Sequence, residues 1–357
     1  SRPWADKLRG ALDDAHGEEA GQELLPQFKE AFGPGYREQY SAVDAVTDIR
    51  KVQSVMTDGC IAMNLYRPDE SDASQIRFKI YHPENPVPLS DVLPLFEHMG
   101  FKVIDERPHA INVGDGQFVM MHDFGLETRD GMAVDLGGIR DNFQASFLRV
   151  WNGDIESDGF NALVSRGGLA WREVIVLRAY CKYLRQAGIT FSQAYMEQTL
   201  ANNPGLTRDI VNLFMARFEP ATAKESSIRA KRLLSRLLRG LELVVSADED
   251  RILRRFVNMV ESTLRTNFFQ MTADGKPKSY LSFKLDSQKL DELPLPRPLR
   301  EIFVYSPRVE GVHLRFGMVA RGGLRWSDRR EDFRTEVLGL VKAQQVKNAV
   351  IVPVGSK

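Results

Sequence analysis

The spacing of apolar residues changes along the chain, and this change constrains the fold more than any other feature. Between residues 60 and 124, apolar side chains alternate with polar ones, for example at Ile76, Phe78 and Ile80, which predicts half-buried strands. Between residues 141 and 270 they recur at helical intervals instead. Because the two periods occupy separate blocks, the chain must fold into separate sheet and helical parts.

These blocks predict four parts. A helical segment occupies residues 1–56, a ferredoxin-like module 57–140, a helical subdomain 141–275, and the start of an α/β domain 276–357. The predicted fold class is therefore multidomain, with α+β and α/β parts. The module 57–140 has the strand, helix, strand, strand, helix order of a ferredoxin-like half-sandwich. Such a module either binds a small ligand or serves only packing and oligomerisation, and the pattern leaves both open.

Three local features are predicted within these parts. A helix from Tyr36 to Val55 places Val43 on its apolar side, and Ser90 caps the N-terminus of a short helix. The last helix of the helical subdomain includes Leu264 among its inward residues. No strand pattern interrupts that subdomain.

Composition excludes several classes of function. The 48 basic and 48 acidic side chains cancel, which argues against a nucleic-acid or acidic-membrane binder, and no apolar run is long enough for a membrane span. The two cysteines cannot form a disulfide scaffold and fit a reducing cytoplasm. The six histidines lack the spacing of metal ligands, so no metal site is expected. No Walker A sequence and no glycine fingerprint for a dinucleotide is present.

Both ends suggest an excerpt of a longer polypeptide. The first residue is Ser1 rather than Met, and the chain stops on a turn directly after a strand with a core pattern. The backbone and apolar face of such a strand would lack partners.

Three cations near the C-terminus suggest a binding site. Arg321 precedes two glycines, which allow the backbone to approach a bound group closely. A helix from about Asp332 to Val346 follows, and Lys347 and Lys357 then flank a predicted buried strand at 349–354. Ligands of open α/β sheets bind at the carboxyl ends of strands, and arginine can hold a carboxylate through two hydrogen bonds. These cations would suit a substrate with two separated carboxylates.

The same segment also allows a plainer interpretation, in which its cations are ordinary surface residues. The pairs would then join Arg325, Arg329 and Arg330 to Asp328, Glu331 and Asp332. Spacing alone does not choose between the two interpretations.

A longer pattern resembles a known family. The run Arg321-Gly-Gly-Leu-Arg-Trp-Ser-Asp-Arg-Arg-Glu-Asp-Phe-Arg334, then Lys347-Asn-Ala and Pro353-Val-Gly-Ser-Lys357, is similar to the substrate half of glutamate dehydrogenases. The family pattern is K-G-G-x-R, K-x-A and P-x-G-G-x-K-G-G. An arginine in place of the first lysine resembles the large bacterial NAD-specific class, whose members carry ACT-like ferredoxin modules and helical segments ahead of the catalytic domain.

The resemblance implies roles for these residues. Arg321 and Lys347 would bind the substrate carboxylates, in an order that is not decided, and Lys357 would be the catalytic lysine. Neighbouring cations lower the pKa of a lysine, so that a neutral amine becomes available to assist water attack. The interval from Lys347 to Lys357 is two residues shorter than in the small enzymes of the family.

The implied function is oxidative deamination of L-glutamate to 2-oxoglutarate and ammonium in amino-acid catabolism. The implied enzyme is a cytoplasmic homo-oligomer, with NAD bound by a Rossmann domain beyond this chain and the isolated segment inactive. The alternative is a regulatory or oligomerisation module that binds an amino acid without catalysis. A third possibility is a purely architectural role for the residues before Tyr280.

Overall fold

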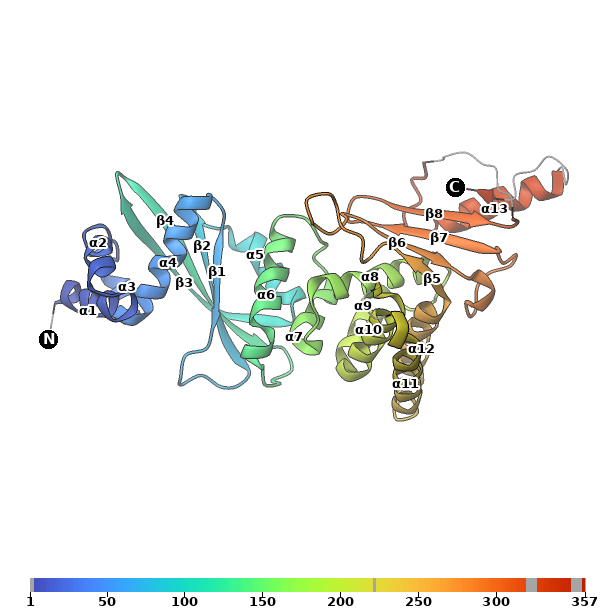
Figure 1. The fold of residues 1–357 in the computed structure, drawn as a ribbon, viewed down its shortest axis with the longest axis horizontal. Helices are drawn as coiled ribbons and strands as arrows, with labels where there is room; N and C mark the ends of the chain where they lie inside the picture. The colour runs from blue at the N-terminus through green and yellow to red at the C-terminus, as the bar shows by residue number, and fades with distance from the viewer. Residues whose placement is uncertain (1–2, 221–222, 319–325, 348–354, 357) are drawn as a thin grey trace. The chain divides into compact units, whose positions relative to one another are not determined.

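The structure is a computed structural model that describes residues 3–220, 223–318, 326–347 and 355–356 (Figure 1). The chain divides into two compact units, Ser1–Gln144 and Ala145–Lys357. The division falls within the helix Leu136–Trp151.

The first unit begins with helices and continues with a sheet. Its helices α1 to α4 are followed by a β-β-α-β-β-α run. The bounds are α1 (Trp4–His16), α2 (Glu18–Phe28), α3 (Pro34–Gln39), α4 (Ala42–Asp58), β1 (Ala62–Tyr66), β2 (Gln75–Pro83), α5 (Leu89–His98), β3 (Phe101–Gly114), β4 (Gln117–Thr128) and α6 (Leu136–Trp151).

The sheet of this unit has the strand order β1-β2-β4-β3, and each neighbouring pair is antiparallel. Strands β2 and β3 are joined through α5 and are separated in the sheet by β4, which is the split crossover of a ferredoxin-like fold. Strand β1 occupies the edge beside β2. The predicted strand and helix order is confirmed.

Strand β2 is buried on both faces, because its alternate side chains meet different layers. On one face Phe78 contacts the rings of Phe96 in α5 and Phe143 in α6, with centroids 5.7 and 5.2 Å apart. On the other face Lys79 and Tyr81 contact α4. The N-terminal helices therefore cover the face of the sheet that α5 and α6 leave open.

The second unit is helical first and then forms a sheet. The bounds are a 3-10 helix Gly159–Ala162, α7 (Leu163–Gly167), α8 (Trp171–Gln186), α9 (Gln193–Asn202), α10 (Pro204–Phe218), α11 (Ala223–Leu241), α12 (Ala247–Ser262), β5 (Thr263–Thr266), β6 (Leu281–Leu285), a 3-10 helix Ser287–Lys289, β7 (Arg300–Tyr305), β8 (Glu310–Arg315), α13 (Phe333–Lys347) and β9 (Gly355–Ser356).

The second sheet has the order β5-β6-β7-β8-β9, and its described strands pair antiparallel throughout. Helices α8 and α13 pack on one face of it. Tyr183 of α8 contacts Phe303, and Val337 of α13 packs with Val312 and Leu314. The predicted multidomain mixture of helices and sheets is confirmed, and the described part of the α/β segment contributes an antiparallel sheet with a helix on it.

The prediction of one continuous helix from Tyr36 to Val55 is wrong, because two helices, α3 and α4, occupy these residues. Ser41 caps a new helix through its bond with the backbone of Asp44, so that α3 and α4 are separate. Val43 is 71% exposed rather than inward. It lies about 180° around the helix from Val52, at roughly 100° per residue, and Val52 is fully buried.

Two further local predictions are wrong. Ser90 lies inside α5, whose N-cap is Pro88, and its hydroxyl bonds to Asp91 instead. Leu264 belongs to β5, where it is 39% exposed, because Thr263 is extended and pairs with Leu285 of β6. Sheet pairing overrides the helical apolar period at this point, so a strand does follow the helices before residue 270.

One further prediction is confirmed. The final helix, predicted from about Asp332 to Val346, is α13. The basic residues of α11 from residue 229 onward, Arg229, Lys231, Arg232, Arg236 and Arg239, are exposed, which is typical of a solvated helix face. Cys181 is buried, and its burial raises the pKa of the thiol well above the usual range. The strand predicted at 349–354 lies outside the described residues.

Candidate functional site

The structure describes the frame around the predicted substrate residues. Arg321 and Lys357 lie outside the described residues. Lys347 is the last residue of α13, and its side chain is not described.

The frame is the edge of the second sheet. Strand β9 pairs with the end of β8, with Gly355 opposite Arg315 and Ser356 opposite Leu314. The backbone directly before Lys357 therefore lies beside the end of β8. Helix α13 packs against the same strand through the apolar cluster formed by Val312, Leu314, Val337 and Leu338.

A buried ion pair fixes the start of α13. Arg334 directs Nε and Nη2 to Oε1 and Oε2 of Glu301 in β7, at 2.7 and 3.0 Å. Both side chains are at most 1% exposed. The hydroxyl of Tyr183 in α8 also donates to Oε1 of Glu301, at 2.9 Å. Burial alone would lower the pKa of Arg334, but the hydrogen bond and charge of Glu301 outweigh it and raise that pKa.

Helix α8 also holds the segment just before α13. The Gln186 side chain donates to the carbonyl of Arg330 at 2.8 Å and accepts from the backbone N–H of Arg334 at 3.1 Å. Ser327 donates to Glu336 at 2.6 Å. The described end of the Arg321–Arg334 run is thus tied to α8 and β7 by polar contacts.

One cation of this run, Arg329, is an ordinary surface residue, as the second interpretation of the sequence proposed. Arg329 forms an ion pair with Asp332, and both side chains are about half exposed. Glu331 lies 3.5 Å from Arg185 of α8 rather than pairing with an arginine of the run. Arg325 lies outside the described residues.

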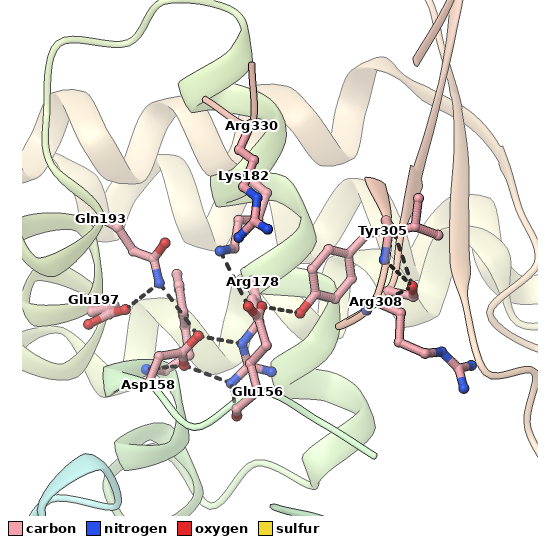
Figure 2. A network of polar contacts seen from close by, with 12 residues as sticks. Glu156, Asp158, Arg178, Lys182, Gln193, Glu197, Tyr305, Arg308 and Arg330 are labelled. Atoms are coloured by element: carbon pink, nitrogen blue, oxygen red, sulfur yellow. Dashed lines mark hydrogen bonds and ion pairs between the residues drawn. The ribbon is translucent and has the colours of Figure 1, made fainter. Parts of the chain in front are cut away.

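A second polar network links the 155–162 segment to α8 and β7 (Figure 2). Arg178 is fully buried and holds both oxygens of Asp158 at 2.7 Å, with Asn161 accepting a further bond at 2.7 Å. The charge of Asp158 overcomes the cost of burial and raises the pKa of Arg178. Tyr305 of β7 donates its hydroxyl to Glu156, which lies 3.6 Å from Lys182. Each end of β7 is therefore anchored to α8, by Glu301 at one end and Tyr305 at the other.

Sequence reasoning missed these anchors, although signals for them exist. Arg178 interrupts the apolar stripe that runs from Trp171 to Leu184, where a charge must be paired if it is buried. Glu301 shares the inward alternation of Phe303 and Tyr305, which places a carboxylate on a buried face. The arginine that pairs with Glu301 is 33 residues away, and no periodicity identifies it.

The first unit also contains a buried charge cluster. Asp48 of α4 accepts two bonds from Lys79 at 2.9 Å, together with bonds from the hydroxyls of Tyr36 and Tyr81. Burial and the charge of Asp48 raise the pKa of both tyrosines far above the usual range, so these hydroxyls stay protonated donors. The ammonium and both tyrosine hydroxyls all donate to Asp48, and such a network stabilises a structural ion pair.

The described residues do not fit NAD. Their sheets are antiparallel, so this part of the chain offers no parallel β-α-β turn at which a helix N-terminus could hold a pyrophosphate. Across the described ranges, no group of three or more histidine, cysteine and acidic side chains could hold a metal ion. None of the helices described is long and apolar enough to cross a bilayer.

Comparisons with known proteins cover most of the chain. The family described as bacterial NAD-glutamate dehydrogenase, catalytic domain, matches residues 236–357. Glutamate dehydrogenase helical motif 3 matches 155–220, the ACT3 domain 60–139, and helical motif 2 matches 11–55. The chain belongs to the bacterial NAD-glutamate dehydrogenase family. The predicted family and its ACT-like module are therefore confirmed.

Its relatives agree over the whole chain. The NAD-specific glutamate dehydrogenase of Halomonas elongata is 47% identical over 358 residues. Those of Pseudomonas aeruginosa and Mycobacterium tuberculosis are each 44% identical. Each alignment covers 100% of this chain but 22% of the relative. The chain thus corresponds to about a fifth of the length of these family members.

Proposed function

We propose that this chain is the part of an NAD-dependent glutamate dehydrogenase that contributes the start of its substrate site. The reaction is oxidative deamination of L-glutamate to 2-oxoglutarate and ammonium. The observation that carries this proposal is 44–47% identity over the whole chain to bacterial enzymes named for that activity.

Three residues carry the chemistry in this proposal. Arg321 and Lys347 bind the two carboxylates of the substrate, and Lys357 is the catalytic lysine. The frame supports this assignment, because β9 pairs with β8 next to Lys357 and α13 ends at Lys347. Charged donors suit a dicarboxylate because their hydrogen bonds to ionised oxygens are short and strong.

In this proposal, NAD binds to a Rossmann domain that lies beyond this chain. When bound there, NAD would supply the hydride acceptor that the reaction requires. Cytoplasmic location, a homo-oligomer and a role in amino-acid catabolism belong to the same proposal. So does the division into parts at 1–56, 57–140, 141–275 and 276–357.

The test is glutamate-dependent NADH formation by the full-length enzyme that contains these residues. We expect Lys357→Ala to lower kcat by about 10²- to 10⁴-fold, which is the range for loss of an acid–base group. Lys342→Ala is the matched control, since Lys342 is an exposed lysine of α13. Equal kcat values for both variants would refute the role of Lys357.

The alternative, an amino-acid-binding regulatory module, concerns the first unit. The ACT3 match over 60–139 favours it as an additional role rather than a replacement. Calorimetric titration of the chain with amino acids tests it. Saturable binding that is unaffected by Lys347→Ala would support this role.

A further inference from the structure

The second unit contains a cavity of about 230 Å³ where α8 begins. It lies between the N-terminal turn of α8, the loop before β6 and the turn between β7 and β8. Its lining carries five basic side chains against one acidic one. The basic residues are Arg149, Arg172, Lys276, Lys278 and Arg308, and the acid is Asp154.

Two of these cations already have partners. Arg149 lies 3.2 Å from Asp154, and Lys276 lies 3.5 Å from Asp274. Among the described residues, no carboxylate pairs with the other three. The cavity therefore keeps an excess of positive charge.

Arg172, one of these three cations, is half-buried. One of its terminal nitrogens donates to the carbonyl of Phe268, and its guanidinium lies 4.6 Å from the centre of the Phe268 ring. The other terminal nitrogen, Nη1, is buried without a hydrogen-bond partner in the described part of the chain. A buried donor without an acceptor is costly, so an incoming acceptor would be favoured here.

The electrostatic environment of Arg172 also favours a bound anion. Burial lowers the pKa of Arg172, and the positive charge of Arg149 lowers it further. A bound anion would offset both effects. Arg172 also lies in the first turn of α8, where the helix dipole is positive.

This cavity lies away from the described backbone that flanks the proposed substrate residues. Its strand contacts are Leu281 and Tyr305, which pair with each other at one end of the sheet. The segment toward Arg321 leaves β8 at the other end, beyond Arg315, and β9 pairs there. Strand β8 spans about 17 Å at about 3.4 Å per residue, so the two regions lie at opposite ends of one sheet.

We propose that this cavity is a binding site for a small anion with two or more carboxylate or phosphate groups. Arg172, Lys278 and Arg308 supply the uncompensated charge, and Ile175, Phe268 and Leu281 supply the apolar wall. The volume is below the roughly 300 Å³ at which ligand pockets usually begin, which selects a compact ligand and excludes a dinucleotide.

The cavity is placed to act on the frame of the substrate site. Tyr305 lines it at one end of β7, and Glu301 holds Arg334 at the other end. Helix α8 likewise runs from Arg172 in the cavity to Gln186 at the Arg334 backbone.

The experiment is calorimetric titration of the intact chain at low ionic strength with two probes, citrate and pyrophosphate. We expect saturable binding of at least one probe. Binding of citrate alone identifies a polycarboxylate ligand, and binding of pyrophosphate alone identifies a phosphate-bearing one.

Variants separate this site from general charge attraction and from the substrate residues. The double variant Lys278→Met/Arg308→Met should weaken binding at least tenfold. Arg265→Met/Lys289→Met removes the same charge from exposed positions outside the cavity and should change the dissociation constant less than twofold. Lys347→Ala should leave binding intact. Circular dichroism checks that each variant is folded.

Three results would overturn the proposal. The first is that neither probe binds. The second is that binding survives in Lys278→Met/Arg308→Met. The third is that the control double variant or Lys347→Ala loses binding to the same extent.

Discussion

Arg334 of α13 and Glu301 of β7 form a bidentate ion pair, and neither side chain is more than 1% exposed. This pair joins the last residue of the Arg321–Arg334 run to the centre of the second sheet. In the proposed function this run contributes Arg321 to the substrate site, and an anchor at its end is useful because small displacements of binding groups cost catalytic rate.

Removing one member of this pair should be strongly destabilising. Arg334→Met leaves Glu301 buried without its charge partner, and we expect a loss of about 3–5 kcal/mol in the free energy of unfolding. Urea denaturation of the intact chain measures it. The double variant Glu301→Leu/Arg334→Met should recover much of the loss, because no unpaired charge remains. The exposed Arg329→Ala serves as control and should change little. A double variant less stable than Arg334→Met would contradict this account.

The Asp48–Lys79 pair predicts a similar effect in the first unit. Asp48→Ala leaves the ammonium of Lys79 without its carboxylate, in a residue that is 3% exposed. We expect a loss of about 3–5 kcal/mol in the unfolding free energy of that unit. Asp69→Ala, which removes an exposed carboxylate, should have almost no effect. Equal stability of the two variants in urea denaturation would show that Lys79 finds another partner.

His109 predicts a pH dependence of stability. Burial lowers its pKa below the usual value, against the smaller opposing effect of Asp123. The unfolded chain therefore binds a proton more readily, and stability contributed by neutral His109 is present above about pH 6.5 and is lost as pH falls through the folded-state pKa.

The measurement compares the melting temperature of wild type and His109→Phe between pH 8 and pH 5. The ring of His109 lies 5.6 Å from those of Tyr36 and Tyr40, so phenylalanine keeps the ring contacts. The variant should lose less stability than wild type on acidification. A steeper loss in the variant would reverse the assigned sign.

The two cysteines should differ in reactivity. Cys60 is exposed, whereas Cys181 is buried and its thiol has a raised pKa. Only the thiolate attacks a disulfide reagent, so one thiol per native chain should react with Ellman's reagent and two in denaturant. Cys60→Ala should abolish the native reaction, and any rapid remaining reaction would mean that Cys181 is accessible.

The chain by itself should not turn over glutamate. Hydride transfer requires the substrate and the nicotinamide to be held together, and the described residues do not fit NAD. Adding L-glutamate and NAD to the purified chain should therefore yield no NADH above a blank without protein. Clear turnover would refute the proposal that NAD binds elsewhere.

The predictions from sequence succeeded where local pattern decides the structure. Alternation at Ile76, Phe78 and Ile80 identified β2, and the helix predicted from about Asp332 to Val346 corresponds to α13. They failed where distant pairing decides. Thr263 is extended rather than helical because its backbone pairs with strand β6. Val43 is exposed because the opposite side of α4 packs against the sheet.

The sequence by itself determined the family, the order of elements in the ferredoxin-like module, and the cations proposed to bind substrate, because motifs and periodicities depend on neighbours along the chain. Only the tertiary structure decided which buried charges meet. The pairs Arg334–Glu301 and Asp48–Lys79 depend on contacts between segments far apart in the chain, and so does the environment that leaves Nη1 of Arg172 without a partner among the described residues. The position of a charged residue in the sequence does not identify its partner, because Coulomb attraction depends on distance in space and not on separation along the chain.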